Sequence, residues 1–269
     1  MVKIHPLATV SPNAKLGEGT EVGPYAYIAD NVELGENCKI LPHANIFPYV
    51  KMGRDCTVYP GAVVGAEPQD LKFDGEVSWV EIGDRVTIRE CATINRGTAA
   101  SGKAVTKVGS DTLIMSYVHI AHDCTIGNHC ILVSYVGLAG ETDVDDWAIL
   151  GGGAKAHQFS HIGTHAMVGG MVTINKDIPP YALVGKSPAV FAGINIVGLR
   201  RRGFSTDVIR NIKDIYDTIY FEGLNVSDGI AKIQSGFPKS EERDIIIDFI
   251  VKSKRGIIRS FRPGERSDE

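Results

Sequence analysis

Six of the eight histidines lie between residues 119 and 165, and two of them share the segment His-Ile-Ala-His-Asp-Cys at residues 119–124. An imidazole has a pKa of about 6.5, so it can take up a proton at neutral pH, and a neighbouring carboxylate can orient it. His122 and the adjacent Asp123 are therefore the residue types expected of a general base and of the carboxylate that orients it. A lone surface histidine is more often merely solvated, so the prediction depends on what surrounds His122 in the fold.

The element that would position these residues is a repeat of six. Every sixth residue from Ile4 to Val64 is aliphatic, and after two interruptions the period runs from Val108 to Ile174 with Ala156 as its only weak member. An amphipathic helix repeats every 3.6 residues or so and a flat strand every second residue, so neither sustains this pattern. The period predicts short strands, three to a coil of about 18 residues, stacked into a left-handed parallel β-helix.

The repeat also predicts which side chains lie near His122. His119 and His122 fall at outward positions, Gly140 lies one coil beyond His122, and Gln158 lies two coils beyond it with His157 alongside. We expect His122 to deprotonate a substrate hydroxyl as that hydroxyl attacks a thioester carbonyl. The Gly140 N–H would then hydrogen-bond the developing oxyanion. No paired serine or cysteine nucleophile is evident, so no covalent enzyme intermediate is expected.

Composition narrows the class of protein. With 28 basic and 32 acidic side chains the net charge is −4, which gives no general attraction to nucleic acid or to an anionic membrane. No apolar run has signal-peptide or membrane-spanning length, so we expect a cytoplasmic protein without stable membrane insertion. Neither a cofactor nor a bound metal is expected. The odd number of cysteines argues against disulfides, and four fall at the small inward position of the repeat, where packing is their expected role: Cys38, Cys56, Cys124 and Cys130.

Two polar stretches interrupt the repeat, and a change of period ends it. Residues 65–81 and 95–107 lack the pattern and are expected to project from the coil as loops that shape a site. The β-helix is predicted to span residues 1–195. Residues 196–269 are predicted to form a C-terminal α-helical domain with a frayed tail from Arg262 to Glu269.

Within the helical domain the capping residues predict three helices. Ser205, Ser227 and Ser240 are the expected N-caps. Gly223 is the expected stop of the first helix, and the third is expected to end at Arg255–Gly256.

Several short motifs, in order along nearly the whole chain, resemble those of bacterial UDP-N-acetylglucosamine O-acyltransferases. The resemblance implies a homotrimer of left-handed β-helices with active sites in the clefts between subunits. It also implies transfer of a 3-hydroxyacyl group from acyl carrier protein to the 3-OH of UDP-N-acetylglucosamine, the first step of lipid A biosynthesis. The motifs are QDLK (69–72), NRGT (95–98), TKVGSD (106–111), HIAHDC (119–124), AHQF (156–159), MVGG (167–170), DIPPY (177–181) and GLRRRGFS (198–205).

The same resemblance assigns roles to individual residues. It makes His122 the general base, Asp123 its partner and Gly140 the oxyanion donor. It places a further set around the substrate, and Gly170 at the position that limits acyl length, where a missing side chain predicts a long acyl chain of about C14 or more. The substrate set is Asp70, Lys72, His119, His157, Gln158, Asn195, Arg201 and Arg202.

The chain also departs from the family pattern at three positions. Glu141 and Asn95 replace family histidines, and Val197 replaces a family acid. These departures bear on contacts to the nucleotide or sugar, including whether the acceptor carries a 3-OH or a 3-amine.

A late group of basic residues could dock the acidic acyl carrier protein, or could simply offset the partial charge at helix C-termini. The group comprises Arg200–Arg202, Lys252, Lys254, Arg255, Arg259 and Arg262.

Three other functions fit parts of the same pattern. An acyltransferase acting on a different sugar nucleotide, or using acetyl-CoA, would share the fold. A zinc-dependent trimer of the carbonic anhydrase type would use the histidine-rich region. A non-catalytic scaffold would use the β-helix as a rigid wall.

Overall fold

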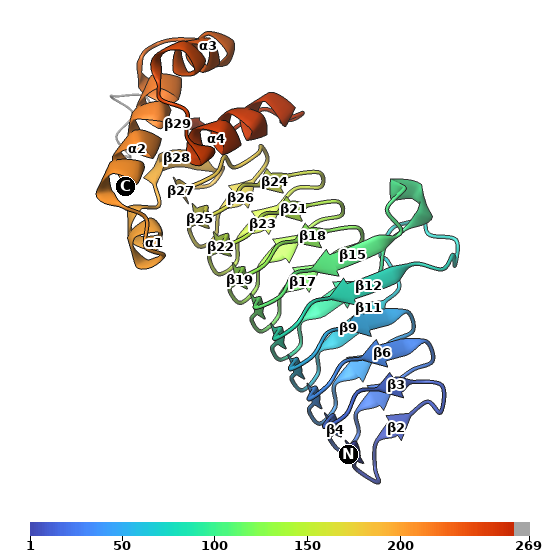
Figure 1. Cartoon of the computed structure of the whole chain (residues 1–269). Helices are drawn as coiled ribbons and strands as arrows, with labels where there is room; N and C mark the ends of the chain where they lie inside the picture. Colours follow the sequence, from blue (N-terminus) through green and yellow to red (C-terminus); the bar gives the residue numbers. More distant parts are fainter. Residues whose placement is uncertain (261–269) are drawn as a thin grey trace.

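Three sheets form the faces of a long stack of coils, with a helical cap at one end (Figure 1). The computed structural model describes residues 1–260, so the tail expected at Arg262–Glu269 lies outside the described residues. The twelve-stranded sheet contains β1 (Lys3–Ile4), β4 (Glu21–Val22), β7 (Lys39–Ile40), β10 (Thr57–Val58), β13 (Thr87–Ile88), β16 (Leu113–Ile114), β19 (Ile131–Leu132), β22 (Ile149–Leu150), β25 (Met167–Val168), β27 (Ala182–Gly185), β28 (Val190–Ile194) and β29 (Arg259–Ser260).

The other two faces contain only parallel strands. The nine-stranded sheet contains β2 (Thr9–Val10), β5 (Tyr27–Ile28), β8 (Asn45–Ile46), β11 (Val63–Ala66), β14 (Thr93–Asn95), β17 (His119–Ile120), β20 (Gly137–Leu138), β23 (Lys155–Ala156) and β26 (Thr173–Ile174). The eight-stranded sheet contains β3 (Lys15–Leu16), β6 (Val32–Leu34), β9 (Val50–Met52), β12 (Trp79–Ile82), β15 (Val105–Val108), β18 (Thr125–Ile126), β21 (Asp143–Val144) and β24 (His161–Ile162).

The repeat of six produces this stack directly. Each strand pairs with the strand one coil further along, so that Lys3 pairs with Glu21 and Glu21 with Lys39. The aliphatic member of each strand lies inside the coil, as at Ile40, while its neighbour Lys39 is exposed. The left-handed parallel β-helix predicted from the repeat is confirmed.

The two interruptions are loops rooted in long strands. β11 continues to Ala66 and β12 begins at Trp79, so the first loop comprises residues 67–78 rather than 65–81. β14 ends at Asn95 and β15 begins at Val105, so the second loop comprises residues 96–104 rather than 95–107 and contains one short 3-10 helix, Ala99–Ser101. The strands extend into the polar stretches because β12 and β15 pair with each other over four residues.

The turns of the coil meet at three corners, which run the length of the stack. The His122 corner, from the nine-stranded to the eight-stranded sheet, carries His122, Gly140 and Gln158. The Arg202 corner, from the eight-stranded to the twelve-stranded sheet, carries His129, Trp147 and His165. Arg202 contacts the last two of these residues. The Gly170 corner, from the twelve-stranded to the nine-stranded sheet, carries Gly152 and Gly170.

The last coil is closed by an antiparallel hairpin of β27 and β28, to which β29 adds in parallel. In the described part of the chain four helices follow the hairpin, namely α1 (Ile196–Arg201), α2 (Thr206–Phe221), α3 (Val226–Gly236) and α4 (Glu241–Lys252). Among the described residues 1–260, none of these helices is long and apolar enough to span a membrane.

The predicted helix boundaries are partly wrong. Ser205 and Ser240 do cap α2 and α4, since their hydroxyls accept the backbone N–H groups of Val208 and Arg243. The cap of α3 is Asn225, not Ser227, because the amide oxygen of Asn225 accepts the N–H of Asp228 and so starts the helix earlier. The short helix α1 was not predicted, and α4 ends at Lys252 rather than at Arg255–Gly256.

We expect Ile40→Ala to lower the free energy of unfolding by about 2–5 kcal/mol, because it removes a fully buried side chain from a coil that can collapse only partly. Lys39→Ala, at the adjacent outward position, should change it by less than about 0.5 kcal/mol. Guanidinium denaturation of the three proteins at one protein concentration measures both effects. Equal losses in the two variants would contradict the assignment of inward and outward positions.

Candidate active site

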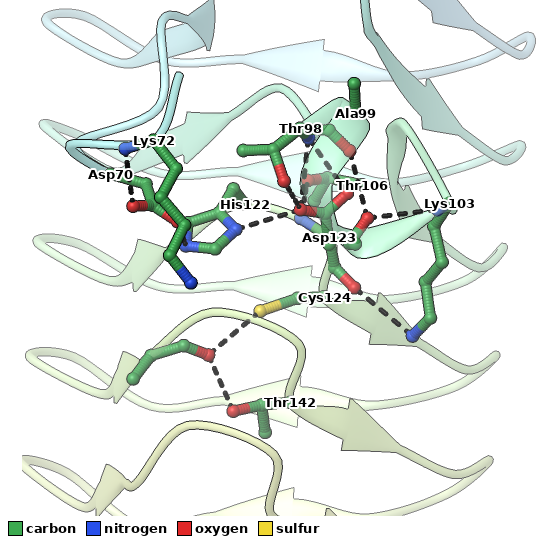
Figure 2. Close-up of polar contacts among 12 residues, drawn as sticks. Asp70, Lys72, Thr98, Ala99, Lys103, Thr106, His122, Asp123, Cys124 and Thr142 are labelled. Carbon is green, nitrogen blue, oxygen red and sulfur yellow. Dashed lines mark hydrogen bonds and ion pairs between the residues drawn. The ribbon is translucent and has the colours of Figure 1, made fainter.

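His122 and Asp123 form a hydrogen-bonded pair at the His122 corner (Figure 2). Nδ1 of His122 lies 2.9 Å from Oδ2 of Asp123. The Asp123 carboxylate can only accept this bond, because both of its oxygens also accept donors from Thr98. Nδ1 must therefore carry the proton, which leaves the lone pair of Nε2 available.

His122 is outside the coil, as its register position predicted, but it is not solvated: only 8% of the residue is exposed. The first loop folds over it and places Oδ2 of Asp70 at 3.5 Å from Nε2. Asp70 is itself fixed by a turn in which its carboxylate accepts the N–H of Lys72. Figure 2 shows the Lys72 side chain running past the same imidazole, so the first loop brings both residues to His122.

Gly140 lies directly against the imidazole ring. A Cβ built on Gly140 would lie 2.4 Å from both Cε1 and Nε2 of His122, a separation that no side chain could occupy. The Gly140 N–H has no hydrogen-bond acceptor within residues 1–260, whereas its carbonyl accepts the N–H of Phe159. A free backbone donor thus lies in the turn that packs on the proton-accepting nitrogen, which is the arrangement expected of an oxyanion donor.

A groove of about 440 Å³ opens between Nε2 and the nine-stranded sheet. His119 lines it, and Nδ1 of His119 lies 2.8 Å from the Thr93 hydroxyl. Burial, and secondarily the charge of Lys155, lowers the pKa of His119, so this ring is neutral at pH 7 and suited to hydrogen bonding rather than to charge pairing. Gln69 of the QDLK motif also lines the groove, as does Lys155, which the sequence did not single out.

His157 and Gln158 follow one coil beyond Gly140. His157 is exposed and its Nδ1 lies 3.0 Å from the carbonyl oxygen of Gln158, while that oxygen also accepts a bond from Arg255 at 3.2 Å. The two residues therefore extend the surface of the His122 corner towards the helical cap. Arg255 joins this corner from a segment that is distant in sequence.

Asn195, Arg201 and Arg202 do not contact His122. Asn195 is buried and caps α1 by accepting the N–H of Gly198, and its amide donates to the carbonyl of His165. Arg202 packs on the Arg202 corner, where it reaches Nδ1 of His165 at 3.1 Å and the carbonyl oxygen of Trp147 at 3.0 Å. Arg201 is exposed.

Gly170 lies on the third corner. A Cβ there would meet only the backbone of Gly152, with its carbonyl oxygen at 3.2 Å, so most of the space beyond Gly170 is open. Within one chain, the predicted site residues thus occupy three separate corners, and only the residues near His122 come together.

The three departures from the family pattern have different environments. Asn95 is buried, and its amide donates to the carbonyl oxygens of Ala66 and Glu67, so it anchors the first loop. Val197 is exposed on α1, and Glu141 follows Gly140 at a positive φ of 57°.

Thr98 ends the NRGT motif, but no role was predicted for it from the sequence. Its hydroxyl and its N–H both donate to Asp123. A threonine within a polar stretch carries no signal of this contact, because the contact depends on how the second loop folds back.

No group of three or more histidine, cysteine, aspartate or glutamate side chains within residues 1–260 of one chain is arranged to hold a metal ion.

The comparisons with known proteins identify the family and agree with the fold. The family model for bacterial transferase hexapeptide repeats matches residues 13–48 and 106–140, and the model described as "Udp N-acetylglucosamine O-acyltransferase; Domain 2" matches residues 177–258. The first match defines the class of protein as a hexapeptide-repeat transferase.

Named relatives match nearly the whole length of the chain. Proteins of Thiobacillus denitrificans and Burkholderia lata, both named acyl-(acyl-carrier-protein)–UDP-N-acetylglucosamine O-acyltransferase, are 46% and 48% identical over 259 and 263 residues, which are 96% of this chain and 100% of each relative. The chain belongs to this family.

Solved structures agree. A UDP-N-acetylglucosamine acyltransferase from Bacteroides fragilis superimposes with a TM-score of 0.93 at 50% identity, over 95% of this chain and 100% of that one. The corresponding enzyme of Francisella novicida gives a TM-score of 0.93 at 38% identity, over 98% of this chain and 95% of that one.

The Arg202 corner makes stability depend on pH. Burial and the neighbouring Arg202 lower the pKa of His165 from its ordinary 6.5 to about 4. Between these values the unfolded chain binds a proton that the folded chain does not, so we expect the free energy of unfolding to fall as the pH falls from 6.5 towards 4. His165→Gln should flatten this dependence, which denaturant titrations at a series of pH values measure.

His43→Gln is the matched control, because His43 also stacks on an aromatic ring, that of Tyr25, but on another corner. The same pH dependence in the wild type and in His165→Gln would show that His165 is not the titrating group.

Proposed function

We propose that His122 is the general base for transfer of an acyl group from acyl carrier protein to UDP-N-acetylglucosamine, in lipid A biosynthesis. The observation that carries the proposal is the geometry at the His122 corner. Asp123 accepts the Nδ1–H of His122, so Nε2 faces the groove as a proton acceptor beside the free N–H of Gly140. The name that the relatives carry describes the same donor and acceptor.

In the proposed step Nε2 of His122 removes the proton of the sugar 3-OH as that oxygen attacks the thioester carbonyl carbon. The new C–O bond forms a tetrahedral oxyanion, to which the Gly140 N–H donates a hydrogen bond. The C–S bond then breaks, and the imidazolium returns its proton to the departing thiolate of the carrier protein. The products are an ester and a thiol, and His122 is neutral again.

Direct transfer fits the chemistry of the nearest thiol. Cys124 follows the His122–Asp123 pair, but it is buried and its sulfur donates to the carbonyl of Ala139. Burial raises the pKa of Cys124 to about 12, so the thiolate needed for an acyl-enzyme is scarce at neutral pH.

Asp70, Lys72 and His119 would bind the sugar. Asp70 and Lys72 lie beside the His122 imidazole, and His119 lines the groove. The carboxylate of Asp70 occupies the space in front of Nε2 that an acceptor hydroxyl would enter. We expect the incoming sugar to take over this contact. His157 and Gln158 would bind the part of the substrate nearest the helical cap.

Arg201, Arg202 and Asn195 would bind the diphosphate and nucleotide, since guanidinium groups hold phosphate oxygens with paired hydrogen bonds. Within one chain they lie on or next to the Arg202 corner and do not contact the His122 corner. A substrate that reaches both must therefore lie between two copies of the chain.

A homotrimer satisfies this requirement, because three prisms around one axis place unlike corners side by side. The outer surface of the twelve-stranded sheet supports the proposal. It carries a row of partly exposed apolar side chains. Burying these side chains between subunits would remove apolar surface from water and stabilise the assembly. The row consists of Leu113, Ile131, Ile149 and Met167.

Gly170 would leave room for a long acyl chain, as expected from the sequence, because little lies beyond its Cα. Arg255 would help to dock the acidic carrier protein, since it lies against Gln158 on the His122 corner. The cytoplasmic location stays a prediction.

We expect the purified protein to acylate UDP-N-acetylglucosamine from 3-hydroxyacyl carrier proteins, with the best rates at about C14 or longer, and not from acetyl-CoA. His122→Ala should lower kcat by about 10²–10⁴, the range expected when a general base is removed. Initial rates with a series of donor chain lengths measure both.

His43→Ala is the control, because it removes a histidine on the Gly170 corner that has no proposed role. Turnover of acetyl-CoA in place of the carrier protein would favour a different hexapeptide acyltransferase. Near-normal turnover by His122→Ala would rule out the proposed base.

A further inference from the structure

Asp123 is the most enclosed charged residue near the site, with none of its surface exposed. The N–H of Thr98 lies 3.0 Å from each of its carboxylate oxygens, and the Thr98 hydroxyl donates to Oδ2 at 2.7 Å. The same Oδ2 accepts Nδ1–H of His122. Within residues 1–260, a single residue of the second loop thus supplies every hydrogen bond to this carboxylate other than the one from the base.

Thr98 is held in place by its neighbours in the chain. Asn95 donates to the carbonyl of Glu67 at 2.7 Å, and the buried guanidinium of Arg96 lies over the rings of Tyr49 and Phe73. These contacts lock the start of the second loop to the first loop and to the coil wall.

Gly97 allows the loop to approach Asp123, because a Cβ there would lie 2.6 Å from Oδ1 of Asp123. The backbone of Asp123 is fixed separately, by its N–H donating to the Thr106 hydroxyl at 2.8 Å. Asp123 therefore has little freedom to rotate.

We infer that Thr98 is a positioning residue for the acyl transfer, which rests on the proposed function. Its two donors compensate the buried charge of Asp123 and hold the carboxylate in the plane where it accepts Nδ1–H. The imidazole is then fixed in one tautomer and one orientation, with Nε2 facing the groove. Thr98 acts on the reaction only through Asp123 and His122.

Removal of the Thr98 hydroxyl should change the electrostatic interaction between Asp123 and His122. With one donor fewer, negative charge concentrates on Oδ2 and stabilises the protonated imidazole of His122 more strongly. The base then needs a higher pH to be neutral. The charged and titratable groups around the pair stay unchanged in such a variant: Asp70 and Lys72 beside the imidazole, Lys103 at the Asp123 carbonyl, and His119 and Lys155 in the groove.

The test compares Thr98→Val, which keeps the shape and the N–H but loses the hydroxyl, with Thr98→Ser, which keeps the hydroxyl. We expect Thr98→Val to lower kcat roughly 10-fold to 100-fold, the loss expected for a hydrogen bond to a buried charge, with little change in KM for the acceptor. The acid limb of its kcat/KM profile should move to higher pH. Thr98→Ser should restore both.

Thr112→Val is the matched control, because Thr112 is equally buried and its hydroxyl donates to the carbonyl of Gly127, on the Arg202 side of the coil. If Thr98→Val does not fold, as judged by circular dichroism, the smaller Thr98→Ala takes its place.

Kinetics of Thr98→Val that equal those of Thr112→Val, or a loss of kcat with an unmoved acid limb, would overturn the positioning role. If the wild type is active, either of these two results leaves the proposed function unaffected. An inactive wild type would instead contradict the proposed function itself, and the role of Thr98 with it.

Discussion

The parallel pairing of each strand with the strand one coil further along is the interaction on which the rest of the structure depends. It fixes the spatial neighbour of every residue in the coil, so side chains far apart in sequence form straight columns along three faces and three corners. A column cannot be adjusted locally, because a shift by one residue would turn the buried aliphatic side chains outward. Such a rigid frame suits a reaction in which a base, an acceptor hydroxyl and a backbone donor must meet within hydrogen-bonding distance.

The columns alone do not make the site. At the His122 corner they bring Gly140 against His122, but the solvent is excluded by the two loops that interrupt the repeat. The first loop supplies Asp70 to the outer nitrogen of the imidazole, and the second supplies Thr98 to the partner carboxylate. The coil sets the position of His122. The loops provide the burial and the hydrogen bonds that hold its imidazole in one tautomer.

Features set by the period could be predicted from the sequence, whereas features set by tertiary folding could not. The β-helix and the contact between His122 and Gly140 could be predicted by counting residues, because each coil has the same length. The Thr98–Asp123 contact could not be predicted by counting residues, because the irregular backbone of a loop has no repeat. The cap of α3 was misplaced at Ser227 because Asn225 and Ser227 are both good capping residues, and only the backbone path decides between them. Within one chain Asn195 and Arg202 lie away from the base, and no residue spacing in the sequence predicts that separation.

The central claim is that Nε2 of His122 receives the proton of the attacking hydroxyl in a cleft between chains. The most direct test is the distance between Nε2 and the 3-oxygen of the sugar in a crystal structure with UDP-N-acetylglucosamine bound. The account predicts a distance of about 2.6–3.2 Å, with the diphosphate held by Arg202 of a neighbouring chain. A 3-oxygen beyond hydrogen-bonding distance of Nε2, or a nucleotide held entirely within one chain, would contradict it.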